Sequence, residues 1–114
     1  MSESCIFCKI IRGEIPCQKV FENEHVLVFK DIHPVAPVHC LAVPKKHIPT
    51  LNDATPADAP VLAAIPLALA KVAADLGVAT DGYRVITNVN SAGGQEVFHL
   101  HFHLLAGRQM KRMG

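Results

Sequence analysis

The sequence has 114 residues, of which 50% are hydrophobic, and its formal net charge is +1 at pH 7. A chain of this length forms one domain, here residues 1–114, with room for a real hydrophobic core. The near-neutral charge provides no basic field of the kind that attracts nucleic acid, so no nucleic-acid partner is expected.

The N-terminal sequence Met1-Ser2-Glu3-Ser4 lacks the basic and apolar regions of a signal peptide. The longest apolar stretch, from Ala59 to Ala70, is too short for a membrane span and contains two prolines. We therefore expect a cytoplasmic protein that does not enter a membrane. Four cysteines in such a chain indicate thiols or metal ligands rather than disulfides.

Residues 5–12 predict a short helix, with Ser4 as its N-cap and Gly13 at its left-handed exit. The helix begins with a Cys-x-x-Cys pair, Cys5 and Cys8. Its apolar residues, Ile6, Phe7, Ile10 and Ile11, favour core packing over a ligand pocket.

Two strands, residues 18–21 and 25–30, predict a hairpin around the turn residues 22–24. The next segment, 31–37, contains two prolines and predicts an ordered surface loop, because proline cannot continue a central strand. A third strand is expected at residues 39–43.

Residues 55–76 predict the one long helix, with Thr55 as N-cap and Pro56 at the first helical position. Pro60 and Pro66 would each remove a backbone hydrogen bond, so a kink or a late start is expected.

A fourth strand is predicted at residues 83–88, followed by a flexible turn at 90–94. Gly93 and Gly94 in this turn would let backbone N–H groups approach phosphoryl oxygens, although most Gly-Gly pairs are simply turns. Strands with short returns and one long helix indicate an α+β fold with an antiparallel sheet, whose edges invite a second copy.

The last predicted strand, residues 98–105, alternates strictly between apolar residues and histidine. Its apolar side chains would enter the core, and its histidines would line the other face. The apolar set is Phe98, Leu100, Phe102 and Leu104, and the histidines are His99, His101 and His103.

Same-face neighbours on a strand are roughly 6.7 Å apart, so the outer two histidines would be roughly 13 Å apart. Two neighbouring imidazoles could share one metal ion, but three at that spacing could hardly converge on one, which favours separate roles. Imidazole is nucleophilic at cellular pH and can attack phosphorus if an acceptor holds its far nitrogen.

The run from His99 to Leu105 resembles the His-φ-His-φ-His-φ-φ signature (φ apolar) of the histidine-triad (HIT) superfamily of nucleotide hydrolases and transferases. Further segments resemble its Hint branch, the purine nucleoside phosphoramidases. They are Ile6-Phe7, Lys9-Ile10-Ile11, Glu14-Ile15-Pro16, Asp31-Ile32, Ala36-Pro37, Pro44-Lys45-Lys46-His47, Asn88, Gly93-Gly94-Gln95 and Gly107-Arg108-Gln109-Met110.

The resemblance implies the HIT fold, an antiparallel sheet of about five strands with one long and one short helix, which dimerises into a continuous sheet. It implies cleavage of P–N or acyl-phosphate bonds of purine nucleoside monophosphates, such as AMP derivatives, through a covalent nucleotidyl-histidine. Two alternatives stay open: a dinucleoside polyphosphate hydrolase, and a binding module that holds AMP or a partner without turnover.

The resemblance also implies roles for single residues. His101 is the nucleophile, the backbone carbonyl of His99 orients it, and His39 gives a proton to the leaving amine. Asp31 accepts the ribose hydroxyls. The α-phosphate contacts are His103, Asn88 and Gln95, and the residues around the base are Ile6, Phe7, Phe29 and Leu41, for each of which plain core packing is the alternative.

Cys5, Cys8, His47 and His99 match a set that binds structural zinc in some superfamily members. Two thiolates and two imidazoles form a closed tetrahedral set, and the alternative is an unmetallated thiol pair. Glu96 stands where eukaryotic relatives carry serine, a feature that resembles bacterial members. The chain stops at Gly114 without the aromatic-proline ending of those eukaryotic relatives.

Overall fold

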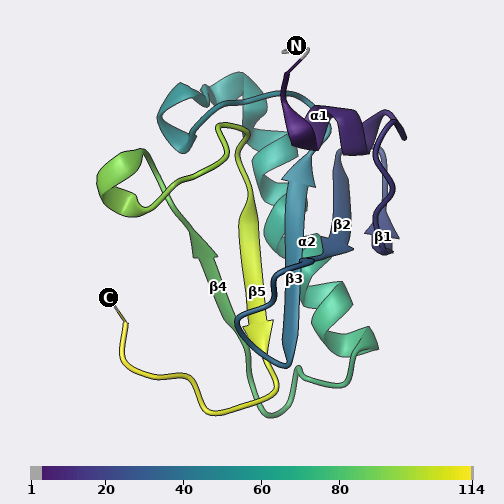
Figure 1. The fold of residues 1–114 in the computed structure, drawn as a ribbon, viewed down its shortest axis with the longest axis vertical. Coiled ribbons are helices and arrows are strands. Elements are labelled where there is room, and N and C mark those ends of the chain that lie inside the picture. Colours follow the sequence, from purple (N-terminus) through teal and green to yellow (C-terminus); the bar gives the residue numbers. More distant parts are fainter. Residues whose placement is uncertain (1–3, 114) are drawn as a thin grey trace.

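The computed structural model describes residues 4–113; Met1-Ser2-Glu3, on which the signal-peptide expectation rests in part, and Gly114 lie outside them. Five antiparallel strands form one sheet in the order β1-β2-β3-β5-β4 (Figure 1). The strands are β1 Lys19–Glu22, β2 Val26–Lys30, β3 Val38–Pro44, β4 Arg84–Thr87 and β5 Phe102–Ala106. The helices are α1 Ile6–Ile11 and α2 Ala59–Asp75. The predicted α+β class and the sheet of about five strands are confirmed.

The N-terminal half follows its local sequence signals closely. Asn23 closes the predicted hairpin, because its side-chain oxygen accepts the N–H groups of His25 and Val26. Gly13 leaves α1 with a φ of +80°, as expected. The predicted cap is wrong: Cys5, not Ser4, is the N-cap of α1, and its sulfur accepts the N–H of Cys8.

The long helix starts late, as its prolines predicted. Pro56–Asp58 form a 3₁₀ turn, and α2 begins at Ala59, so Pro60 lies at the helix start where no N–H is needed. By length and composition Pro56–Asp75 could cross a membrane. In this fold, however, α2 buries Ile65, Leu69 and Val72 against the sheet.

Alternating side chains divide the sheet into two faces. Val28 of β2, Ala42 of β3 and Leu104 of β5 pack against α2 in the larger core. Phe29 and Leu41, from the same strands, join a second cluster with Phe7 of α1. Because both faces of the central strands are covered, β2 and β3 are almost continuously apolar.

The predicted strand at residues 98–105 is wrong in its first half. The β5 ladder begins at Phe102, the first residue that pairs with both β3 and β4. Before it, the chain turns toward the segment after β3, where the Leu100 N–H donates to the carbonyl of Ile48 at 2.7 Å. Leu100 is buried as expected, but Phe98 is 49% exposed and does not enter the core.

Candidate active site

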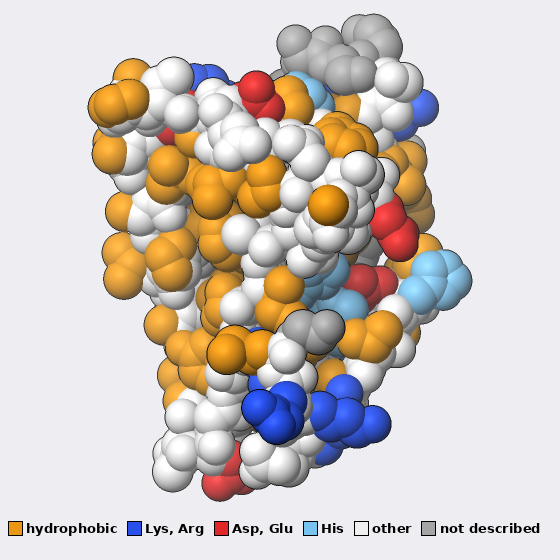
Figure 2. Space-filling model, turned by 90° about the vertical axis from the view of Figure 1, so that its left-hand side faces the viewer, with side chains coloured by type: hydrophobic (Ala, Val, Ile, Leu, Met, Phe, Trp, Pro, Cys, Tyr) orange, Lys and Arg blue, Asp and Glu red, His pale blue; other side chains and the backbone are white. Residues whose placement is uncertain are grey.

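A cavity of about 490 Å³ lies on the α1 side of the sheet, within the range of small-ligand pockets. The space-filling view shows histidine and acidic side chains together in a hollow at one side of the molecule (Figure 2). The cavity walls come from α1, from the end of β2 and the loop after it, from β3, from the segment between β4 and β5, and from β5 itself. Segments far apart in the sequence therefore meet at one pocket.

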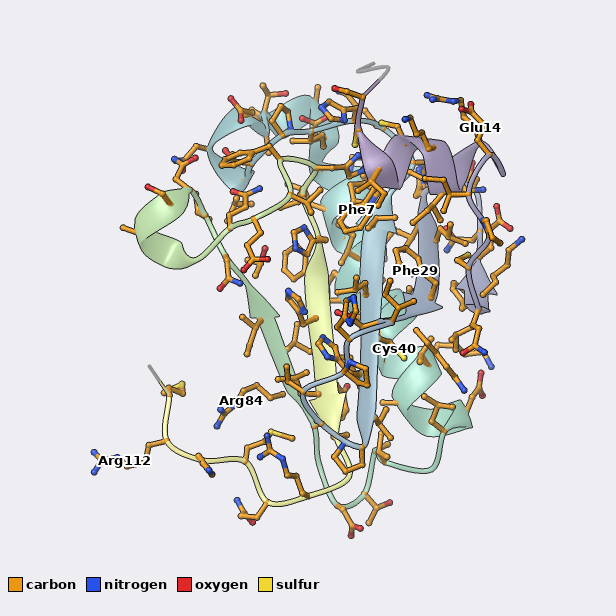
Figure 3. The ribbon with its side chains drawn as sticks, in the orientation of Figure 1. Phe7, Glu14, Phe29, Cys40, Arg84 and Arg112 are labelled. Carbon is orange, nitrogen blue, oxygen red and sulfur yellow. The ribbon has the colours of Figure 1, made fainter. Side chains whose placement is uncertain are left out.

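One end of the cavity is apolar. Its wall contains all four residues predicted to surround a purine base, Ile6, Phe7, Phe29 and Leu41, together with Ile10 and Val97. The rings of Phe7 and Phe29 meet edge to face with centroids 5.8 Å apart, and Figure 3 shows them on neighbouring elements. Ile10 and Val97 were not among the predicted site residues, although Ile10 lies one helical turn from Ile6.

His101 lies at the polar end with one ring nitrogen fixed. Its Nδ1–H donates to the backbone carbonyl of His99 at 2.8 Å. Since a neutral imidazole carries one proton, Nε2 of His101 holds a lone pair. The residue is buried, lines the cavity and meets the ring of Phe7 edge to face, with ring centroids 5.1 Å apart. This is the orientation that a nucleophilic histidine requires.

His103 and His39 form a second pair of imidazoles beside His101. Nδ1 of His103 lies 2.9 Å from Nε2 of His39, which is also 3.3 Å from a carboxylate oxygen of Asp31. Burial lowers the pKa of His39, an effect that the carboxylate of Asp31 opposes. Burial and then the neighbouring His101 lower the pKa of His103 to about 4. Burial therefore favours the neutral form of both rings.

The predicted phosphate contacts lie in different surroundings. Asn88 lines the cavity, as does the exposed Glu96. Gln95 is buried outside the cavity wall, where its amide group donates to the carbonyls of Pro49 and Val97 and accepts the N–H of Asn90. Its side chain holds the loop in place and leaves no amide group directed at a phosphate.

The Gly-Gly turn does not offer its N–H groups to a ligand. The N–H of Gly93 donates to the carbonyl of Asn90, and that of Gly94 donates to the carbonyl of Ser91. The segment Ser91–Gly93 is a 3₁₀ turn, and Gly94 has a φ of +87°. The two glycines therefore shape the loop, which is the structural alternative that the sequence left open.

A second cluster brings together the four predicted metal ligands, Cys5, Cys8, His47 and His99, whose ligand atoms all lie within 4.8 Å of one another. Nδ1 of His99 is 3.3 Å from the sulfur of Cys5, and Nδ1 of His47 is 3.2 Å from the sulfur of Cys8. The two Nδ1 atoms are 3.1 Å apart. A zinc ion with ordinary bond lengths would space such atoms by about 3.3–3.8 Å, so the set fits a tetrahedral site.

The surroundings of the cluster favour metal ligation. The Nε2–H of His99 donates to the carbonyl of Pro44 at 2.8 Å, which leaves the Nδ1 lone pair directed into the cluster. Burial raises the pKa of the Cys8 thiol to about 11, and a hydrogen bond with Cys5 and the charge of Cys5 act in the same direction. Buried thiols of this kind become ligands only by losing their protons to a bound cation.

Comparison with known proteins identifies the family of the chain. The HIT domain family matches residues 12–110. The purine nucleoside phosphoramidase of Escherichia coli (strain K12) is 47% identical over 113 residues, which cover 99% of this chain and 95% of that protein. A HIT family hydrolase from Legionella pneumophila superimposes with a TM-score of 0.92 at 53% identity, covering 95% of this chain and 96% of that one.

A histidine triad protein from Clostridium difficile superimposes with a TM-score of 0.96 at 46% identity, covering 100% of this chain and 99% of that one. The chain belongs to the HIT family. Its HIT fold and its resemblance to the purine nucleoside phosphoramidases, both expected from the sequence, are confirmed.

Proposed function

We propose that the protein is a nucleotide hydrolase that cleaves P–N or acyl-phosphate bonds of purine nucleoside monophosphates. The observation that carries this proposal is the fixed tautomer of His101, whose Nδ1–H is held by the carbonyl of His99. Its Nε2 lone pair adjoins a cavity with an apolar end for a base and a polar end for a phosphate. The phosphoramidase relative and the HIT hydrolase structure support this class of reaction.

The reaction has two displacements at phosphorus. Nε2 of His101 forms a bond to the α-phosphorus while the bond from phosphorus to the leaving nitrogen or oxygen breaks, and that atom takes up a proton. Water then attacks phosphorus and the P–Nε2 bond breaks, which releases the nucleoside monophosphate and leaves a proton for solvent. His103 and Asn88 would contact the phosphoryl oxygens, and Asp31 would accept the ribose hydroxyls.

Trapping of the intermediate tests this proposal. Adenosine 5′-phosphoramidate is mixed with the enzyme and quenched in base, and intact mass spectrometry should show one added adenylyl group on wild-type protein. His101→Ala should lose both the adduct and the turnover while it still binds AMP. Turnover of His101→Ala close to the wild-type rate would refute the mechanism.

A substrate panel separates the two alternatives. Faster turnover of diadenosine polyphosphates than of phosphoramidates or lysyl-adenylate would identify a dinucleoside polyphosphate hydrolase. AMP binding without turnover of any of these compounds would identify a binding module. Either result would replace the proposed bond specificity.

We further propose that Cys5, Cys8, His47 and His99 hold a structural zinc ion. Bound there, the metal supplies a crosslink and takes no part in the reaction at phosphorus. The four residues would tie α1 to the segments after β3 and before β5. Because α1 also carries Ile6 and Phe7, this tie would keep the base end of the cavity in place.

We also propose a homodimer in which two copies pair along β4, one edge of the sheet. The other edge, β1, carries Lys19 and Glu22, charged residues that discourage pairing between strands. On β4, Val85 is 41% exposed, and Figure 2 shows extensive apolar surface on this side of the molecule. Light scattering should give a dimer for wild type and a monomer for Val85→Lys.

A further inference from the structure

Glu96 places a carboxylate without a protein partner on the wall of the candidate active-site cavity. The residue is exposed, and it lines the cavity together with its neighbour Val97. Among the residues that the structure describes, none forms a hydrogen bond or an ion pair with the Glu96 side chain. An exposed carboxylate is charged at pH 7 and only accepts hydrogen bonds, so Glu96 is available to a donor or a cation on the ligand.

The backbone at Glu96 is fixed from both sides. The buried side chain of Gln95 donates to the carbonyls of Pro49 and Val97 and accepts the N–H of Asn90. The bond from Gln95 to the Val97 carbonyl closes a tight loop with Glu96 at its apex. Val97 itself packs against the apolar cluster around Phe7. The carboxylate of Glu96 therefore extends from an ordered loop.

No cationic side chain on this face of the sheet balances the carboxylate. Among the described residues that line the cavity, none is an arginine, and the only lysine is Lys30. Lys30 pairs with Cys40 across the ladder, and Cys40 belongs to the core on the α2 side. Side chains of paired residues lie on the same face of a sheet, so the Lys30 ammonium group belongs to the opposite face. Burial raises the pKa of the Cys40 thiol, and the charge of Lys30 acts against this effect, which agrees with that placement.

The second carboxylate in the cavity wall is already engaged. Asp31 accepts the N–H of His33 at 2.8 Å and lies 3.3 Å from Nε2 of His39. Glu96 is therefore the carboxylate that remains open to a charged group on the ligand.

The depth of His101 in the cavity assigns Glu96 to the side of the leaving group. His101 is buried, whereas Glu96 is exposed at the open side of the same cavity. In a displacement at phosphorus, the attacking and the leaving atoms lie roughly in line. When His101 attacks from the buried side, the leaving group points toward the open side. Two exposed apolar residues also line the cavity, Ile32 at 84% exposure and Val35 at 64%.

We propose that Glu96 is a specificity-determining residue whose carboxylate selects leaving groups with a positive charge on an apolar stem. This inference rests on the proposed function and names the kind of leaving group that the site favours. An ammonium group on a short alkyl arm would pair with Glu96 while its methylene groups cover Ile32 or Val35. This ammonium group is separate from the nitrogen that leaves phosphorus, so it keeps its protons while the P–N bond breaks.

The same carboxylate disfavours a polyphosphate leaving group. In a dinucleoside polyphosphate, the departing nucleotide carries further phosphates, which would extend toward Glu96 with no cationic side chain to balance their charge. Like charges in a partly enclosed site repel each other, whereas an ammonium group is attracted. Glu96 therefore favours phosphoramidate or acyl-phosphate substrates over dinucleoside polyphosphates.

Three phosphoramidates of AMP with arms of equal length test this charge selection. Their leaving amines are ethylenediamine, propylamine and glycine, which end in an ammonium, a methyl and a carboxylate group. Because these amines differ in intrinsic reactivity, the quantity to compare between enzyme variants is the ratio of kcat/KM values for two compounds.

Glu96→Gln keeps the size and polarity of the side chain and removes its charge. It should lower the ammonium-to-methyl ratio by roughly fivefold, the upper range for an exposed ion pair, and should raise the carboxylate-to-methyl ratio. Glu96→Lys should move both ratios further in the same directions. Added salt should bring the wild-type ratios toward those of Glu96→Gln.

The matched control is Glu24→Gln, which removes an exposed carboxylate from the hairpin turn outside the cavity wall. It should leave both ratios unchanged. Equal ratios in wild type, Glu96→Gln and Glu96→Lys would overturn the inference, as would a Glu24→Gln variant that shifts them as far as Glu96→Gln. Turnover that needs a divalent cation in wild type but not in Glu96→Gln would assign the carboxylate to a metal ion and would also overturn it.

Binding measurements separate this inference from the proposed function. Calorimetric titration of His101→Ala with the same three compounds requires no turnover. Adding Glu96→Gln to that variant should weaken binding of the ammonium compound relative to the methyl compound. Wild-type enzyme that hydrolyses none of the three compounds would refute the proposed function, and the titrations would still decide whether Glu96 selects the charge. Equal changes in binding for all three compounds would overturn that selection.

Discussion

Removal of metal from the Cys5, Cys8, His47 and His99 cluster should lower the stability of the whole domain. The ligands are far apart in the sequence: Cys8 and His47 are separated by 39 residues, and His47 and His99 by 52. A crosslink that closes a loop of this size lowers the entropy of the unfolded chain, an effect of about 4 kcal/mol on the free energy of unfolding.

For a domain of this length, 1 kcal/mol changes Tm by about 4 °C, so metal removal should lower Tm by roughly 15 °C. The assay is differential scanning calorimetry of zinc-supplemented protein with and without a chelator, together with elemental analysis for one zinc per chain. Cys8→Ser should have the low Tm without any chelator. Cys17→Ser, in a half-buried thiol outside the cluster, is the matched control and should keep its zinc.

The reasoning would fail if the protein held well under one zinc per chain after supplementation and its Tm did not respond to the chelator. It would also fail if Cys8→Ser and Cys17→Ser behaved alike. In either case Cys5 and Cys8 would be ordinary thiols. A separate AMP titration should show weaker nucleotide binding after metal removal, because α1 carries Phe7 into the cavity wall.

Three further predictions concern single side chains. Asp31→Asn should raise KM more for ribonucleotide than for deoxyribonucleotide substrates in steady-state assays, and equal effects would remove Asp31 from the ribose site. Phe7→Ala removes the ring packed on Phe29 and His101, so calorimetric titration should show AMP binding weakened by roughly five- to tenfold. A hydrogen bond from Lys46, then one from the Thr55 backbone, lowers the pKa of Asp58 in the folded protein. Its stabilisation is therefore present above the unfolded pKa of about 3.9 and is lost as the pH falls through the lower folded pKa. Asp58→Asn should weaken the pH dependence of unfolding in this acid range, and an unchanged profile would refute that role.

Most of the fold could be predicted because its elements carry local signals. Asn23 marks the hairpin turn, Gly13 marks the exit from α1, and Pro60 marks the late start of α2. The two faces of β2 and β3 could not be assigned in advance, because strands buried on both sides lose their apolar–polar alternation.

The site was harder to predict where backbone groups define it. A sequence motif includes Gln95 but does not show that its amide binds the backbone at Pro49 and Val97. Nor does any side-chain pattern identify Val35, which acts on His39 through its main-chain N–H. Any residue except proline provides such a donor, so the identity of the residue at position 35 does not indicate that its N–H binds His39.

The wrong strand boundary before Phe102 is where the structure departs most from the expected alternation, and it has a functional consequence. In a regular strand, the carbonyl of His99 would lie in the plane of the sheet and bond to a neighbouring strand, while the side chain of His101 would stand perpendicular to it. Because the ladder begins only at Phe102, the His99 carbonyl is free to accept Nδ1–H of His101, and the His99 side chain joins the cysteine cluster. The break in the strand therefore connects the candidate metal site to the candidate nucleophile through one residue. Since the alternating sequence alone favours a continuous strand, only the three-dimensional structure shows this connection.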